Sequence, residues 1–239
     1  MYPDVTSTSS RVKIEYNRLT HIGLETDDMG AISTFSGNND DALLPSQSSI
    51  RFNSVCGATR PATKGIYLDN CASGWDVSGN IVLHTGKMQI FIHSGSNNLI
   101  SSNVFVSSNL ASAKAGVTLN NALNCNTTSN KFVNNIVYVS NVPEAVVQVP
   151  PEAIGEWDRN LYYSPLVDLA TPVYNQTALS NFSGLKHTAP KIPFHALFGG
   201  WGTWRNNGFD TSSRVALPPF RAPEEGDFCL KNISPELSA

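Results

Sequence analysis

One hexapeptide pattern recurs along this chain and limits its possible folds more than any other feature. The pattern is an apolar residue, two variable residues, an asparagine, one variable residue and a second apolar residue, and we count five copies. Their asparagines are Asn17, Asn53, Asn80, Asn103 and Asn135. Spacings of this size fit one coil of a solenoid plus loops of variable length. We therefore expect the asparagines to form a structural column in which each amide bonds to its neighbours above and below.

A second series of short apolar strands lies between the copies. Its members are residues 30–33, 65–68, 89–92 and 116–119. Strands this short, with Gly/Ser/Asn turns and no helical periodicity, favour an all-β architecture over βαβ units. The irregular repeat length argues against a β-propeller. The pattern predicts a right-handed parallel β-helix.

The regular pattern is clear as far as Val149, and the pair Pro150-Pro151 interrupts it, because proline cannot donate to a strand ladder. We expect residues 1–149 to form the coils that carry the site. Residues 150–239 are predicted to form irregular final coils and a covering arm of the same domain.

Charge and cysteine content narrow the range of partners. The formal net charge is −3, and no run of basic residues interleaves with aromatics, so nucleic acid is not expected as a partner. No apolar stretch is long enough to span a membrane, and no signal peptide is visible. The four cysteines lack metal-site spacing, so we expect free thiols and neither metal nor cofactor.

Several motifs carry a resemblance to a known family. They are Asp28-Met29-Gly30, Gly65-Ile66-Tyr67-Leu68-Asp69, Ile92-His93-Ser94-Gly95 and, near the end, Asn160-Leu161-Tyr162-Tyr163. Together they resemble the right-handed β-helix glycoside hydrolases of family 141, which include α-L-fucosidases and xylanases acting on plant cell-wall glycans. The likeness spans roughly residues 12 to 237. Such enzymes have further coils before the first motif, so this chain resembles the C-terminal part of a longer protein, truncated on its N-terminal side.

The resemblance implies that Asp28 and Asp69 are the catalytic carboxyl groups. Glycoside hydrolysis uses two such groups roughly 5–9.5 Å apart. In simple register Asp28 lies near the start of its strand and Asp69 at the end of the next, which at about 3.3 Å per residue is too far without a bend. Aligning the strands instead places Asp69, His93 and Asn120 in one column, with His93 beside Asp69. The alternative is a solvated ladder of polar residues at a coil corner.

Other residues near this column have weaker assignments. Glu25 is a reserve acid, and Tyr67, which points away from the side of Ile66 and Leu68, is either a sugar platform or a surface aromatic. With Asn120, they form the predicted substrate-binding set. Asp27-Asp28 and Asp40-Asp41 could bind calcium, although neither pair has the spacing of a known calcium loop.

Three functions remain open at this stage. The first is a glycoside hydrolase acting on a plant cell-wall type polysaccharide or oligosaccharide. The second is a polysaccharide lyase on the same scaffold, with Lys64 or Lys87 as base. The third is a non-catalytic carbohydrate-binding or structural solenoid. In each case we expect the full-length protein to be extracellular and able to self-associate through exposed solenoid ends.

Overall fold

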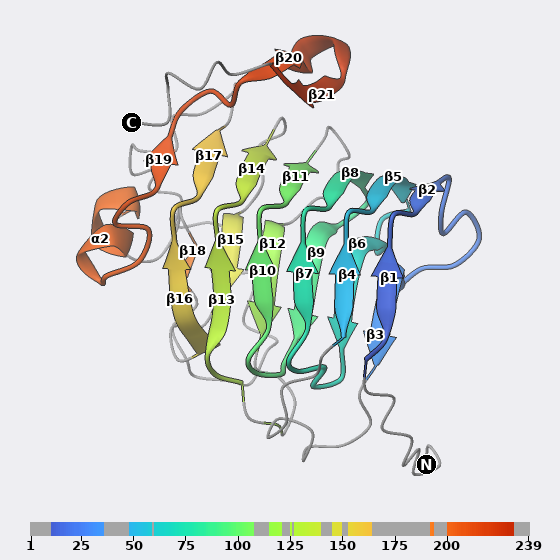
Figure 1. Cartoon of the computed structure of the whole chain (residues 1–239), viewed down its shortest axis with the longest axis horizontal. Helices are drawn as coiled ribbons and strands as arrows, with labels where there is room; N and C mark the ends of the chain where they lie inside the picture. Colours follow the sequence, from blue (N-terminus) through green and yellow to red (C-terminus); the bar gives the residue numbers. More distant parts are fainter. Residues whose placement is uncertain are drawn as a thin grey trace.

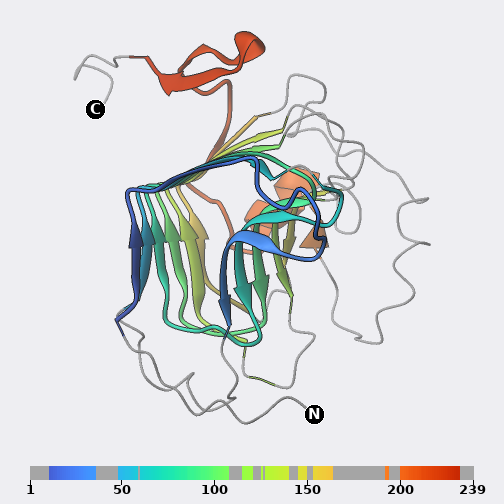
Figure 2. The same cartoon turned by 90° about the vertical axis from the view of Figure 1, so that its right-hand side faces the viewer.

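The structure is a computed structural model that describes residues 11–35, 48–58, 60–107, 115–120, 125, 127–139, 145–149, 153–163, 192–193 and 200–231. These residues form an all-β fold with three large sheets, whose strands lie side by side (Figure 1). From β1 to β18, every third strand along the chain joins the same sheet. Each circuit of the chain therefore contributes one strand to each sheet, and successive circuits overlie one another (Figure 2).

The three sheets are named A, B and C. Sheet A contains β1 (Lys13–Glu15), β4 (Ser49–Arg51), β7 (Asp76–Ser78), β10 (Leu99–Ser101), β13 (Asn130–Val133) and β16 (Ile154–Asp158). Sheet B contains β2 (Arg18–Thr20), β5 (Ser54–Ala58), β8 (Ile81–Thr85), β11 (Val104–Ser107), β14 (Ile136–Val139), β17 (Leu161–Tyr163) and β19 (Arg214–Val215). Sheet C contains β3 (Gly30–Phe35), β6 (Lys64–Asp69), β9 (Met88–His93), β12 (Ala115–Asn120), β15 (Ala145–Val149) and β18 (Ile192–Pro193). The pairs are parallel except β15 with β18, which is antiparallel.

The predicted second strand series corresponds to sheet C, and its predicted register is confirmed. Leu68 pairs with Ile92, and His93 pairs with Asn120. Ile66 and Leu68 are buried in the main core, whereas Tyr67 packs in a separate cluster on the outer face of the sheet. The alternation of inward and outward side chains thus agrees with the strand period of two.

The predicted asparagine column is present at the turn from sheet A to sheet B. Each side-chain amide donates to the Oδ1 of the next asparagine, with Nδ2–Oδ1 distances of 2.9 Å from Asn17 to Asn53, 3.0 Å from Asn53 to Asn80, 2.9 Å from Asn80 to Asn103 and 3.0 Å from Asn103 to Asn135. The backbone N–H of each of the first four also donates to that Oδ1. A shorter ladder that we did not predict joins Asn98 to Asn130 at another turn. The amides therefore satisfy the buried polar groups of the turns.

The residue before each column asparagine adopts a left-handed backbone conformation. The φ values are 59° at Tyr16, 55° at Phe52, 66° at Gly79, 56° at Ser102 and 58° at Asn134. Bulky residues avoid this conformation, at a cost on the order of 1–3 kcal/mol each. Stacking between the Tyr16 and Phe52 rings, 5.1 Å apart, returns only about 0.5–1.5 kcal/mol for the pair. The backbone strain at Tyr16 and Phe52 therefore exceeds the stabilisation that their stacking provides.

The regular pattern continues beyond Val149, further than the sequence analysis predicted. Trp157 begins a sixth copy of the hexapeptide, and its Asn160 accepts the Asn135 amide at 3.3 Å. Beyond it, the Asn160 amide donates to Asp210 Oδ1 at 2.9 Å. Helix α2 (Gly200–Asn206) places Trp204 against Trp157, which covers this end of the core. No helix in the described ranges is both long and apolar enough to cross a membrane.

The final described elements pack on the outside of sheet B. They are β20 (Phe220–Ala222), the 3-10 helix η3 (Pro223–Glu225) and β21 (Asp227–Leu230). Phe220 and Phe228 form an apolar cluster with the outward-facing Val106 and Tyr138. These elements therefore cover part of the outer side of sheet B.

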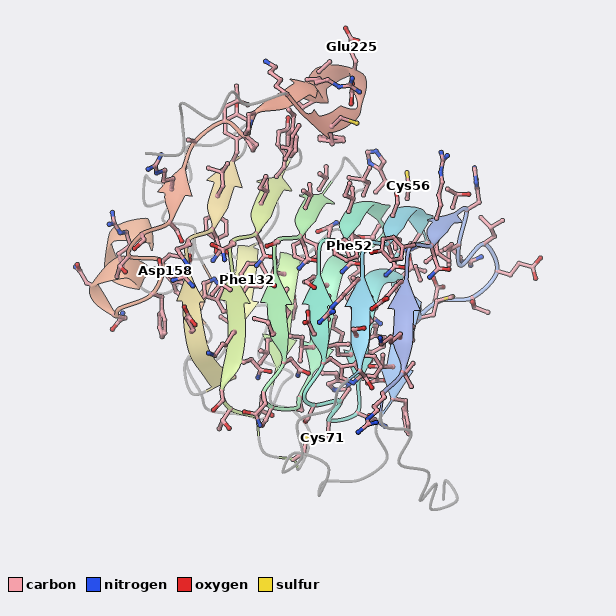
Figure 3. All side chains as sticks on the ribbon, viewed as in Figure 1. Phe52, Cys56, Cys71, Phe132, Asp158 and Glu225 are labelled. Atoms are coloured by element: carbon pink, nitrogen blue, oxygen red, sulfur yellow. A yellow bond between two sulfur atoms is a disulfide. The ribbon has the colours of Figure 1, made fainter. Side chains whose placement is uncertain are left out.

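The expectation of four free thiols is wrong for two of them. Cys71 and Cys125 form a disulfide with a Cα–Cα distance of 6.0 Å, although 54 residues separate them. Coil stacking brings together residues that sequence spacing does not relate, which is why the pairing was missed. Cys56 and Cys229 are free (Figure 3 labels Cys56 and Cys71).

We predict that Asn103→Ala lowers the free energy of unfolding by at least about 3 kcal/mol, because it leaves several buried donors and acceptors unpaired. Among these groups are the Asn80 backbone N–H and the Val77 carbonyl. Denaturant unfolding followed by circular dichroism measures the change. The matched control is Asn17→Ala at the exposed end of the column, which should cost about 1 kcal/mol or less. Equal losses in the two variants would contradict a buried ladder.

A second prediction concerns Asp210, which is fully buried and accepts hydrogen bonds from Asn160, Tyr162, Trp204 and Ser213. Burial raises its pKa from 3.8 to about 6. The folded state therefore binds this proton more tightly than the unfolded state does. The resulting stabilisation is complete below about pH 4 and is lost as the pH rises through about 6, so the free energy of unfolding falls by roughly 3 kcal/mol over this range. Asp210→Asn should remove this part of the pH dependence in urea unfolding, and an unchanged profile would refute the assignment.

Candidate functional site

The candidate site lies on the outer face of sheet C, where the predicted polar column forms. Asp69 ends β6, and its neighbour His93 ends β9, with His93 Nδ1 2.8 Å from Asp69 Oδ1. Both side chains are about one-quarter exposed, at 25% and 24%. A carboxylate only accepts, so Nδ1 of His93 donates this hydrogen bond. The predicted contact between Asp69 and His93 is confirmed.

Tyr67 contacts both His93 and Phe91 of the neighbouring strand β9. Its phenol oxygen is 3.4 Å from His93 Nδ1, and its ring stacks on Phe91 with centroids 5.1 Å apart. Burial raises the pKa of Tyr67, and the hydrogen bond to Asp69 raises it further. The phenol therefore keeps its proton and serves as a hydrogen-bond donor. The ring is only 7% exposed, so it is neither of the predicted alternatives, an open sugar platform or a surface aromatic.

A second charged pair sits beside the Tyr67 ring. Lys64 begins β6 and is 1% exposed, and its ammonium forms an ion pair with Asp28, which is 79% exposed. The same Nζ lies 4.4 Å from the Tyr67 ring centroid, a cation–π contact. The hydrogen bond from Lys64 is the main reason that the pKa of Asp28 is lowered, with smaller contributions from the charges of Lys87 and His93. Asp28 is therefore held as a carboxylate.

The two predicted catalytic aspartates lie at opposite ends of the strands, as expected. The pairing of β3 with β6 begins at Gly30 and Lys64 and ends at Phe35 and Asp69. Asp28 therefore lies before the first pair, and Asp69 belongs to the last. Both aspartates nevertheless raise the pKa of the same phenol, that of Tyr67. Asp69 accepts its hydrogen bond, and the charge of Asp28 contributes to the raised pKa of Tyr67. The Lys64 side chain connects the two ends, because its ammonium contacts both Asp28 and the Tyr67 ring.

The two remaining predicted substrate-binding residues, Asn120 and Glu25, differ in their position relative to the cluster. The backbone of Asn120 pairs with His93 as predicted, while the side chain of Asn120 lies outside the described residues. Glu25 is exposed between β2 and β3, and within the described ranges no hydrogen bond or ion pair joins it to the cluster. Its segment is held instead by Arg60, which donates to the Leu24 carbonyl.

Three residues of the site were missed by the sequence analysis or given another role. Phe91 pairs in register with Tyr67, which the strand alignment could have shown. Phe35 pairs with Asp69 and is 62% exposed on the edge of the site. Lys64 was considered only as a lyase base, and no sequence signal relates it to Asp28.

The calcium alternative receives no support from the described residues. Asp27 pairs with Arg60 at 3.4 Å, and Asp28 pairs with Lys64. In the part of the chain that the structure describes, no three His, Cys, Asp or Glu side chains are grouped as a metal site requires. Asp40 and Asp41 lie outside the described residues.

Comparison with known proteins gives no match to a protein-family model, a curated protein or a solved structure. The resemblance to family 141 therefore stays a prediction from motifs.

The Asp28–Lys64 pair leads to a direct prediction. Lys64→Met keeps an apolar stem against Tyr67 but removes the charge, so the pKa of Asp28 should rise toward its ordinary value. Carbon-13 NMR titration of the Asp28 carboxyl carbon measures it. Lys87→Met is the matched control and should give a smaller rise, because the charge of Lys87 contributes less. An Asp28 pKa that does not change in Lys64→Met would show that the ion pair is absent.

Proposed function

We propose that the chain is a right-handed parallel β-helix that carries a glycoside hydrolase site on the outer face of sheet C. The recurrence of every third strand in the same sheet supports the architecture. The observation that carries the function is the pair of aspartates in unlike surroundings, one bonded to a lysine and the other to a histidine, around a single phenol. Glycoside hydrolysis needs two carboxyl groups with different roles.

The surroundings suggest how the roles are divided. Asp28 is ionised and exposed, which suits the nucleophile or the base that activates water. Asp69 orients the His93 imidazole through Nδ1. The other ring nitrogen, when protonated, can donate to the leaving-group oxygen, so that the Asp69–His93 pair serves as the acid. Tyr67 remains protonated and donates a hydrogen bond that holds Asp69 in place.

Two further observations support parts of the proposal. Lys64 is buried and ion-paired, which argues against its use as the base of a lyase. The Cys71–Cys125 disulfide favours an oxidising compartment, in line with an extracellular protein. Plant cell-wall polysaccharides and oligosaccharides are the proposed substrates, on the strength of the motif resemblance.

The test is sugar release from plant cell-wall oligosaccharides by the wild-type chain and three variants. Asp69→Asn and Asp28→Asn should each lower the rate by about 10²–10⁴-fold, the usual loss when a general acid, base or its partner is removed. Asp27→Asn is the matched control, because Asp27 is adjacent in sequence but contacts Arg60 instead. It should retain the wild-type rate, and circular dichroism should show that all four proteins are folded.

A fully active Asp69→Asn variant would reject the assignment. Glycan binding without turnover by the wild type would favour the non-catalytic alternative. An unsaturated product, detected by its absorbance and abolished by a chelator, would favour a lyase.

A further inference from the structure

A stacked pair of exposed aromatics lies at the turn from sheet A to sheet B, away from the site on sheet C. Tyr16 is 75% exposed and Phe52 is 52% exposed, with an interplanar angle of 21° between the rings (Figure 3 labels Phe52). The next residue in the row is Gly79, where an added Cβ would lie 2.7 Å from the Phe52 ring. Phe52 is thus seated on a glycine and Tyr16 stacks on Phe52, so the two rings form one exposed aromatic surface.

Stability alone does not explain this arrangement. Both residues adopt the left-handed conformation that bulky side chains avoid, whereas the equivalent positions in the next three circuits are Gly79, Ser102 and Asn134. Glycine and asparagine meet the same backbone requirement at lower cost. Strain retained at an exposed position points to a role in binding.

The surroundings of the pair indicate the chemistry of the ligand. The neighbouring exposed side chains of β1 and β2 are polar, namely Lys13, Arg18 and Thr20. A protein-docking surface would need a wider apolar patch. Nearby charges occur in both signs, with Arg51 paired to Asp76 and Glu15 accepting from Ser49. A neutral ligand with one apolar face and many hydroxyl groups fits this combination.

We propose that Tyr16, supported by Phe52, forms a binding platform for a neutral pyranose chain with equatorial hydroxyl groups, such as a cello- or xylo-oligosaccharide. The C–H face of one sugar ring lies on Tyr16. The flanking Glu15, Asn17 and Arg51 provide hydrogen-bonding groups at its rim. This platform binds glycan whether or not the site on sheet C hydrolyses it.

The test is calorimetric titration with cellohexaose and xylohexaose in an Asp69→Asn background, which prevents turnover. Tyr16→Asn should weaken binding of at least one of them about tenfold, the size expected for one aromatic stacking contact. Because asparagine tolerates the left-handed conformation, the thermal midpoint should not fall. Ser102→Asn, at the same turn position without an aromatic, is the matched control and should leave affinity unchanged.

Tyr16→Trp keeps a ring and should retain binding, which separates loss of the platform from misfolding. Unchanged affinity in Tyr16→Asn would overturn the proposal, and so would a fall in the thermal midpoint with affinity equally lost in Tyr16→Trp. Ring-dependent binding of oligouridylate without glycan binding would also overturn it, in favour of a nucleic-acid platform. Loss of hydrolysis by the sheet C site would leave these outcomes unaffected.

Discussion

The hydrogen bonds between stacked asparagine side chains fix the vertical register on which the rest of the structure depends. Each buried amide from Asn53 to Asn135 bonds to the next asparagine and also donates to a backbone carbonyl of the preceding circuit. A slip of one residue would leave these groups unpaired in the interior, where each costs about 1–3 kcal/mol. The column therefore determines which residues of neighbouring strands become neighbours in space.

The candidate site is a consequence of that register. Asp69 and His93 are 24 residues apart in sequence, and they meet because β6 and β9 pair in the register that the core imposes. Inward-facing Leu68 and Ile92 are held in the core, so the following residues both face outward. The same packing places Lys64 and Phe91 around Tyr67. A cluster of polar and aromatic side chains can then form on a face whose opposite side is largely apolar.

Much of this arrangement was predictable from the sequence, because repetition and strand alternation are local patterns. Five members of the asparagine column and the Asp69–His93 contact follow from alignment of the repeats. The sixth member was missed because its apolar positions are Trp157 and Tyr162, aromatics among charged residues. Contacts made by turns and loops were beyond reach, since no periodicity links Lys64 to Asp28 or Cys71 to Cys125. The left-handed turns were also missed, because glycine marks the position at only one of the residues that precede Asn17, Asn53, Asn80, Asn103 and Asn135.

The most direct test of the stacked register is NMR detection of scalar coupling across the hydrogen bond from Asn80 Nδ2 to Asn103 Oδ1. These residues are 23 positions apart, so only the column brings them together. We expect a measurable coupling between the Asn80 amide nitrogen and the Asn103 Cγ carbon in the folded protein, and its loss in denaturant. Absence of the coupling under native conditions, with both side-chain amides exchanging freely with water, would contradict the account.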